Sequence, residues 1–315
     1  MSNARKLADN LPTDGQLGNR NIIINGNFTI SQRGSYTSST SVSDGTFYLD
    51  RWQYVEDGSP SSSLIHNSDG SVKITTGASV TGSSRLRQKF EYSLAPRQYD
   101  NKTFTVSAKV KSNTANARIN VYAGGYLSLT GTTAHSGGGS YETLTATFTT
   151  PSTISTEFSV HIGIDGASSA NVSITSGQYF EVKEVQMEQG SQHTPFEHEP
   201  VGVTLNKCRR YFEVTDQDME IFGTGSVYGA VAYGMWQWQV EKRADPSAGR
   251  WKGAASDYRV RTTGASYNCT ALTISMANRY NCRWNASASG LTNGNSVWLS
   301  TANVNTVQLY ADAEL

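Results

Sequence analysis

Aromatic side chains in the last third of the chain are the residues best suited to binding chemistry. The sequence has 6 Trp and 16 Tyr, and most of the Trp follow residue 230. A sugar binds a protein when its apolar face stacks on an aromatic ring and polar side chains meet its hydroxyl groups. Trp251 lies in a polar, glycine-flanked stretch near Tyr258, Arg259 and Tyr267. We therefore predict that these four residues form a loop site for a glycan.

The other tryptophans are better explained as core residues. Trp236 and Trp238 alternate with polar residues and would share one face of a strand. An indole buries a large area, which favours the core for both and for Trp52. The pattern assigns no role to Trp284 or Trp298.

Motifs for catalysis are missing from the sequence. It has no Gly-x-Ser-x-Gly and no phosphate-binding loop, and Cys208 has no patterned His or Asn partner. The best carboxylate cluster is Glu181, Glu184 and Glu188. Glycoside hydrolysis needs two carboxylates at a defined separation, and this spacing favours solvent-exposed side chains instead. We predict that the chain is not an enzyme and uses no cofactor.

Metal-ligand patterns are weak. His193 and His198 flank a Pro-Phe turn without a third ligand, which favours structural packing. Several Asp residues lie in or near turns, where a sandwich domain could hold a structural Ca²⁺: Asp44, Asp50, Asp69 and Asp165. No Asp-x-Asp-x-Asp loop is present, so no metal is predicted.

Composition excludes some partners. The chain has 26 Lys+Arg and 26 Asp+Glu, so no basic field attracts nucleic acid or an anionic membrane. Charged residues are only 17%, and a neutral surface rich in hydroxyl groups suits neutral glycans. The 3 Cys predict reduced, mostly buried thiols. No apolar run long enough for a membrane span is present, and none near the start suggests a signal peptide.

Apolar and polar residues alternate through much of the chain, which predicts antiparallel strands with one buried face. The clearest runs are 104–111, 117–121, 144–148 and 158–164. Between 178 and 188 the alternation slips by one residue, which predicts a β-bulge at Lys183-Glu184. Strands with no convincing helix between them predict an all-β fold: an antiparallel sandwich or jelly roll, then a smaller β-domain.

Three segments are expected along the chain. Residues 1–20 form either a frayed terminus or an N-terminal anchor segment. Residues 21–200 form the sandwich. The prolines at 195 and 200 break regular structure and predict the boundary. A C-terminal β-domain over 205–315 would follow, entered by a short helical or extended stretch over 203–210. Its expected strands are 228–240, 256–262, 272–276, 280–286 and 305–311.

A series of landmarks supports these boundaries. Asn-Gly-Asn-Phe at 25–28 is followed by Ser-Gln-Arg-Gly at 31–34 and Tyr-Leu-Asp-Arg-Trp at 48–52. A central strand follows at 102–111, and a closing strand and turn at 186–197. In this order the landmarks resemble a carbohydrate-binding-like jelly-roll module of bacteriophage tail-fibre and receptor-binding virion proteins.

Two later segments extend the resemblance. Lys-Cys-Arg-Arg-Tyr-Phe at 207–212 is similar to the entry of a carboxy-terminal domain in that family, and residues 310–315 resemble common fibre endings. The resemblance implies a virion protein, made in the host cytoplasm, that forms a homotrimer. Residues 1–20 would bind other tail or capsid proteins, and the distal domain would bind a host-surface glycan.

Two other functions remain open at this stage. The chain could decorate a capsid or tail without binding sugar, or it could be a glycan-degrading spike. The sequence argues against the spike because it lacks an acid/base pair and long stacked repeats.

Overall fold

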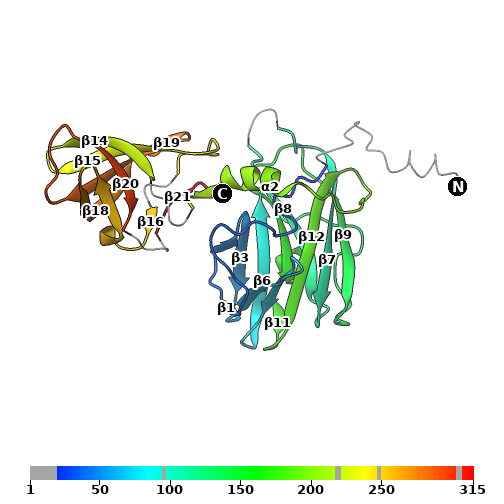
Figure 1. Ribbon diagram of the computed structural model, residues 1–315. Coiled ribbons are helices and arrows are strands. Elements are labelled where there is room, and N and C mark those ends of the chain that lie inside the picture. Colours follow the sequence, from blue (N-terminus) through cyan, green and yellow to red (C-terminus); the bar gives the residue numbers. More distant parts are fainter. Residues whose placement is uncertain (1–19, 94–96, 217–220, 247–249, 303–306) are drawn as a thin grey trace. The chain divides into compact units, whose positions relative to one another are not determined.

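Two compact units make up the protein. The computed structural model describes residues 20–93, 97–216, 221–246, 250–302 and 307–315. The predicted anchor segment at 1–20 therefore lies outside the described residues, apart from its last residue. The units are Met1–Thr204 with Leu315, and Leu205–Glu314. Figure 1 shows the strands of both units.

The first unit is an antiparallel sandwich. Sheet A has the strand order β1 (Thr40–Ser41), β4 (Ser63–His66), β5 (Val72–Thr75), β12 (Tyr179–Gln189), β7 (Thr103–Ser112) and β9 (Tyr141–Thr149). Sheet B has the order β2 (Phe47–Leu49), β3 (Trp52–Asp57), β6 (Val80–Lys89), β10 (Phe158–Ile164) and β8 (Ala117–Ala123), and β11 (Val172–Ile174) also pairs with β6.

Strands that are distant in the sequence are neighbours in both sheets. β5 pairs antiparallel with β12, and β6 pairs antiparallel with β10. This return of late strands beside early ones gives a jelly roll. The all-β class and the sandwich predicted from the alternation are therefore confirmed.

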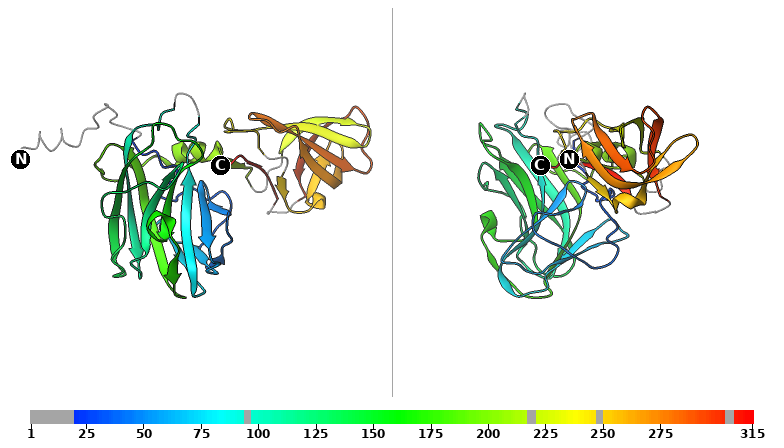
Figure 2. Two further views of the ribbon diagram at one scale, coloured as in Figure 1. Left: turned by 180° about the vertical axis from the view of Figure 1, so that it is seen from behind. Right: turned by 90° about the vertical axis from the view of Figure 1, so that its left-hand side faces the viewer.

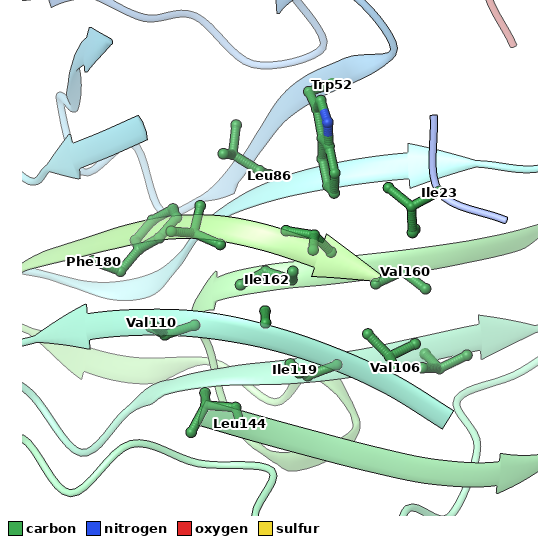
Figure 3. Packing of buried hydrophobic residues seen from close by; sticks show 14 of the residues in the cluster. Ile23, Trp52, Leu86, Val106, Val110, Ile119, Leu144, Val160, Ile162 and Phe180 are labelled. Atoms are coloured by element: carbon green, nitrogen blue, oxygen red, sulfur yellow. The ribbon is translucent and has the colours of Figure 1, made fainter. Parts of the chain in front are cut away.

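The core lies between the two sheets. Val106 and Val110 of β7 meet Ile119 of β8 and Val160 and Ile162 of β10, and all five are fully buried (Figure 3). Each fully buried apolar side chain contributes about 1.5–3 kcal/mol of transfer free energy. Because the inward positions are apolar, the polar positions of the same strands must face outward on each sheet.

The predicted β-bulge is present in β12. Its register against β7 shifts between Lys183 and Gln186, and Glu184 has a positive φ of 53°. The extra residue lets Val182 and Val185 both face the core. The backbone N–H of Val185 then donates to the Gly26 carbonyl at 2.8 Å, which fastens the N-terminal loop to the bulge.

The landmark at 25–28 has a structural role. The Asn25 side chain donates to the carbonyls of Ile30 and Asp50, at 2.9 and 3.1 Å. The Trp52 indole donates to the Asn25 carbonyl at 3.0 Å. Trp52 is only 1% exposed, so its predicted place in the core is confirmed.

The predicted exposure of the glutamate cluster is wrong for two members. Glu188 is 4% exposed and accepts hydrogen bonds from the Thr194 backbone N–H and hydroxyl, at 2.6 and 2.8 Å. Glu181 is 8% exposed and accepts hydrogen bonds from Ser71 and Tyr141. Long-range partners therefore replace water around both carboxylates, and single-strand patterning could not reveal them.

The second unit contains a helix, a small sheet and a closed barrel. The helix is α2 (Val201–Arg209), which begins in the last residues of the first unit, and the small sheet has the order β13 (Phe212–Val214), β21 (Gln308–Asp312) and β16 (Arg250–Lys252). The barrel strands curve round and close on themselves (Figure 2). Their order is β14 (Gly223–Tyr228), β15 (Val231–Gln237), β19 (Asn281–Ala288), β18 (Ser266–Ser275), β17 (Tyr258–Arg261) and β20 (Ser296–Thr301).

The barrel corrects one predicted strand. A single strand was expected over 228–240, but β14 ends at Tyr228 and β15 covers only Val231–Gln237. The two strands form a hairpin because Gly229 adopts a φ of 63° and turns the chain. β20 was not predicted from the sequence. Trp236 and Trp238 are buried and meet edge to face at 4.6 Å, as expected for core residues. Trp284 is also buried, with 0% exposure.

The cysteines and the possible membrane spans can be compared with their predictions. Cys208, Cys269 and Cys282 are buried and form no disulfide with one another, as predicted. In the part of the chain that the structure describes, no helix combines the length and the apolar character needed to cross a lipid bilayer.

Gly26→Ala should destabilise the sandwich by about 2 kcal/mol, because a methyl group there would lie 2.0 Å from the Val185 carbonyl oxygen and force the loop off the bulge. Urea unfolding of the wild type and the variant would measure this loss in unfolding free energy. Gly125→Ala is the matched control, since an added methyl group meets nothing within 4 Å. Equal unfolding free energies for the two variants would contradict the fastening role of Gly26.

Candidate functional site

The residues predicted to bind a glycan do not form one surface. Trp251 lies on β16, pairs with Leu309 and packs half-buried against the barrel core rather than on a loop. Tyr258 is fully buried, and its hydroxyl donates to the carbonyls of Lys252 and Gln308, at 2.8 and 3.0 Å. The expectation for Tyr258 is therefore wrong, because a core side chain presents no surface to a ligand.

Arg259 and Tyr267 lie on opposite sides of their sheet. Arg259 pairs with Asn268 and its Nε donates to the Asn268 side chain at 3.0 Å. Tyr267 pairs with Val260, which faces the barrel interior. Because paired residues point to the same side of a sheet, Tyr267 also lies on the interior side. A glycan role for Trp251, Arg259 and Tyr267 stays a prediction, but they do not act as one site with Tyr258.

A polar surface on the first unit gathers more suitable side chains. The outward positions of β6, β10 and β8 lie in register across sheet B, and we call this surface the sheet B face. His161 pairs with Arg87 on one side and Asn120 on the other. Ser159 pairs in the same way with Lys89 and Tyr122.

A cavity of about 340 Å³ opens on the sheet B face. Its lining residues are Arg87, Tyr122, Tyr126, Thr156, Glu157 and His161. We call it the Tyr126 cavity. Its size is at the lower end of ligand sites, which usually measure about 300–1,000 Å³.

A tight turn positions the tyrosine rings. The Ala123 N–H donates to the Gly125 carbonyl at 2.8 Å, and the Gly124 N–H donates to the Glu157 carbonyl at 3.0 Å. The turn thus brings Tyr126 back over the sheet, edge to face with Tyr122 at 5.2 Å. Tyr126 is 36% exposed, so its ring remains accessible at the rim.

Charged groups at the rim are paired but remain accessible. Glu157 lies 3.5 Å from Arg87 and 3.1 Å from Lys89. Burial alone would raise the pKa of Glu157, but the Ser159 hydroxyl and the two cations outweigh it and lower that pKa. Arg87 also donates twice to the side-chain oxygen Oε1 of Gln53, at 2.5 and 3.1 Å. The rim therefore holds fixed donors beside a fixed carboxylate.

The floor of the cavity is a buried imidazole. His161 is 4% exposed, and its Nε2 lies 2.9 Å from the Ser159 hydroxyl. Its Nδ1 has no hydrogen-bond partner among the described residues. Burial, helped by the charges of Arg85, Arg87 and Lys89, lowers the pKa of His161 to about 3. The imidazole is therefore neutral at physiological pH.

A second polar cluster continues the floor. Arg85 is 5% exposed and pairs with Asp57 at 2.8 Å and Asp165 at 3.2 Å. Asn120 donates to Asp165 and to the Gly166 carbonyl, both at 2.8 Å. These interlocked groups hold the face rigid, which reduces the ordering cost of binding.

The arrangement suits recognition better than turnover. Ser159 and His161 alternate on β10, and Glu157 directly precedes this strand, but the serine hydroxyl donates to Glu157 at 2.7 Å. An imidazole with a pKa of about 3 is a poor general base near neutral pH. Among the described residues, no group of three or more His, Cys, Asp or Glu side chains could hold a metal ion.

Comparisons with known proteins give weak likenesses. No protein-family model matches the chain. No curated protein sequence matches it either. Similar solved structures include a carbohydrate-binding module titled "CBM4 structure and function", at 15% identity and a TM-score of 0.31, covering 53% of this chain and 98% of that chain.

Two other solved structures are similar at the same level. One is the family 11 carbohydrate-binding module of a Clostridium thermocellum cellulase, at 12% identity and a TM-score of 0.30, covering 50% of this chain and 99% of that one. The other is a tandem CBM22 domain from Paenibacillus barcinonensis, at 10% identity and a TM-score of 0.29, covering 89% and 97%. At these TM-scores the likenesses carry no argument about this chain.

The Tyr126 cavity was not predicted from the sequence. One signal was available: basic residues occupy alternate positions of β6, at Arg85, Arg87 and Lys89. Alternation of charges opposite buried residues marks one outward face. The contribution of Tyr126 was not visible, because only the turn after β8 places its ring against His161, at 5.9 Å.

His161 should make folding sensitive to acid. The unfolded chain takes up a proton at an ordinary imidazole pKa near 6.5, whereas the folded chain does so only near about 3. Stability is therefore lost as pH falls below about 6.5, by roughly 3 kcal/mol at about pH 4.5. Urea unfolding of wild type and His161→Gln at about pH 7.5 and 4.5 would measure the difference. An equal acid sensitivity of both proteins would contradict the buried neutral imidazole.

Proposed function

We propose that the chain is a non-enzymatic attachment protein of a bacteriophage particle and binds host-surface glycans through the Tyr126 cavity. One observation carries the proposal: two tyrosine rings, a guanidinium group and a carboxylate converge on one rigid cavity rim. A pyranose offers an apolar face to a ring and hydroxyl groups that both donate and accept hydrogen bonds. The rim supplies a partner for each of these features.

The chemistry of binding follows from the rim. Tyr126 would stack on the apolar face of a sugar ring. Arg87 would donate to a ring or hydroxyl oxygen, and Glu157 would accept from a hydroxyl group. Their side chains are 19% and 26% exposed, so they are reachable and yet shielded enough to strengthen charge-assisted hydrogen bonds. A single small site of this kind binds weakly.

The virion role rests on the sequence resemblance. In this proposal residues 1–20 attach the protein to other tail or capsid proteins, and three copies associate as a homotrimer. Repeating a weak site on one particle raises the effective concentration of the second contact and gives firm adhesion. The assembly also explains why a shallow, polar cavity would suffice.

Tyr126→Ala should weaken glycan binding about tenfold, because it removes a stacking platform worth about 1.5 kcal/mol. A glycan array, followed by calorimetric titration with the best ligand, would measure the loss. Tyr228→Ala is the matched control: Tyr228 is 77% exposed on the barrel and does not line the cavity. Both variants should unfold at the wild-type temperature.

Three outcomes would count against the proposal. Equal binding by Tyr126→Ala and Tyr228→Ala would exclude the Tyr126 cavity. Loss of binding in Trp251→Ala alone would move the site to the second unit. A protein that binds no glycan, and that lies flat on the coat lattice in an image of the particle, would instead be a decoration protein.

A further inference from the structure

A second cavity lies beside the β12 bulge and has no lining residue in common with the Tyr126 cavity. Its volume is about 810 Å³. Its lining residues are Asn27, Thr29, Thr37, His66, Asn67, Ser68, Asp69, Gly70, Lys183, Glu184 and His198. We call it the bulge cavity. Amide, hydroxyl, carboxylate, ammonium and imidazole groups all line it.

The charges of the bulge cavity are already paired within the protein. Lys183 contacts Asp69 at 2.7 Å, and Glu184 contacts Lys109 at 2.7 Å. The Lys183 and Ser71 hydrogen bonds hold the pKa of Asp69 well below its usual range, so this carboxylate stays ionised. With each ion balanced, the cavity has no surplus charge with which to attract an anion or a cation.

The two histidines add polar imidazole groups to the wall of the cavity. Burial lowers the pKa of His66, although the nearby Asp69 charge opposes this shift, so the imidazole is neutral near physiological pH. The His198 ring is held edge to face against Phe196 at 5.0 Å. A neutral imidazole, such as that of His66, can accept a hydrogen bond from a hydroxyl group or donate one to it.

Three segments distant in the sequence fix the walls. The loop containing Asn27 is fastened at Gly26 to the Val185 N–H. The hairpin from Asn67 to Gly70 is closed by its own backbone hydrogen bonds, at 2.8 and 3.1 Å. Glu184 is held in its positive-φ conformation by the bulge, and strained positions of this kind concentrate at functional sites.

An adjoining network holds Lys183 in place. Its ammonium lies 4.5 Å from the centre of the Tyr141 ring. The Tyr141 hydroxyl donates to Glu181 at 2.7 Å, and Glu181 also accepts from Ser71 at 2.8 Å. Lys183 therefore reaches the cavity wall from a fixed direction, which limits the entropy lost on binding.

We propose that the bulge cavity is a second saccharide site and that it takes an uncharged sugar. A carboxylate or ammonium group in an ion pair keeps further hydrogen-bonding capacity, so it can bind a hydroxyl group without a change in charge. The amides of Asn27 and Asn67 supply both donors and acceptors. The cavity volume lies in the range of small-ligand sites. A charged ligand would have to break the Lys183–Asp69 pair.

A second site changes what one chain can do. Two separate sites would let one protein hold two glycan branches at the same time. The second contact would then be intramolecular, so that two weak sites give a stronger combined attachment. The proposal does not depend on the Tyr126 cavity, because the bulge cavity could bind alone.

Histidine NMR signals would distinguish the two sites in the full chain. His66 and His198 line the bulge cavity, and His161 lines the Tyr126 cavity. The probes are uncharged oligosaccharides of glucose, galactose, mannose and N-acetylglucosamine. At least one probe should shift the His66 and His198 signals in both wild type and Tyr126→Ala. Failure of His161 alone to respond would count only against the Tyr126 cavity.

Lysine variants complete the test. Lys183→Met should weaken binding at the bulge cavity about tenfold, because it removes a charged donor worth about 1.5 kcal/mol. Lys73→Met is the matched control, since Lys73 lies over the Tyr179 ring at 4.3 Å and does not line the cavity. Shifts confined to His161, no shift at all, or equal effects of the two lysine variants would each overturn the second site.

Discussion

The hydrogen bond between the Val185 N–H and the Gly26 carbonyl is the contact on which the first unit depends. It joins the N-terminal loop to the extra residue of β12. Without that residue, the apolar positions of the second half of β12 would face water, because a one-residue slip reverses every side chain. The same contact places the loop that carries Asn27. Folding and the bulge cavity therefore share one local constraint.

The polar face of sheet B shows how a chain with few charged residues can build a specific surface. Ion pairs and amide contacts link neighbouring strands around Arg85, Asp165 and Asn120. Their mutual hydrogen bonds satisfy groups that would be costly to bury alone. The rings of Tyr122 and Tyr126 lie beside these polar groups, around His161. The surface is rigid because its polar groups hold one another.

The local alternation of apolar and polar residues predicted the fold of the first unit and some strands of the second. The alternation predicted the sandwich, and the slip at Lys183-Glu184 predicted the bulge, because both depend only on neighbours in sequence. The tight turn after β8 and the barrel closure depend on contacts between distant strands. Short strands of the barrel could not be assigned an inward face, since Arg259 and Tyr258 are consecutive and only pairing decides which is buried.

The glutamates show the same limit at the level of single residues. Glu181 and Glu188 look like exposed charges when β12 is considered alone. Tyr141 of β9, Ser71 before β5 and Thr194 of the following segment bury them and supply their hydrogen bonds. The candidate sites could not be predicted for the same reason, since each is assembled from strands and loops that are distant in the sequence.

The turn at Gly124-Gly125 joins the packed core of the first unit to the exposed rim of the Tyr126 cavity. Its neighbour Ala123 belongs to the core, while Tyr126 lies over the sheet. An exchange at Gly125, where an added methyl group meets nothing within 4 Å, can reshape the cavity rim without disturbing the packed layers beneath it. The exposed ring and the scaffold beneath it can therefore change independently of each other.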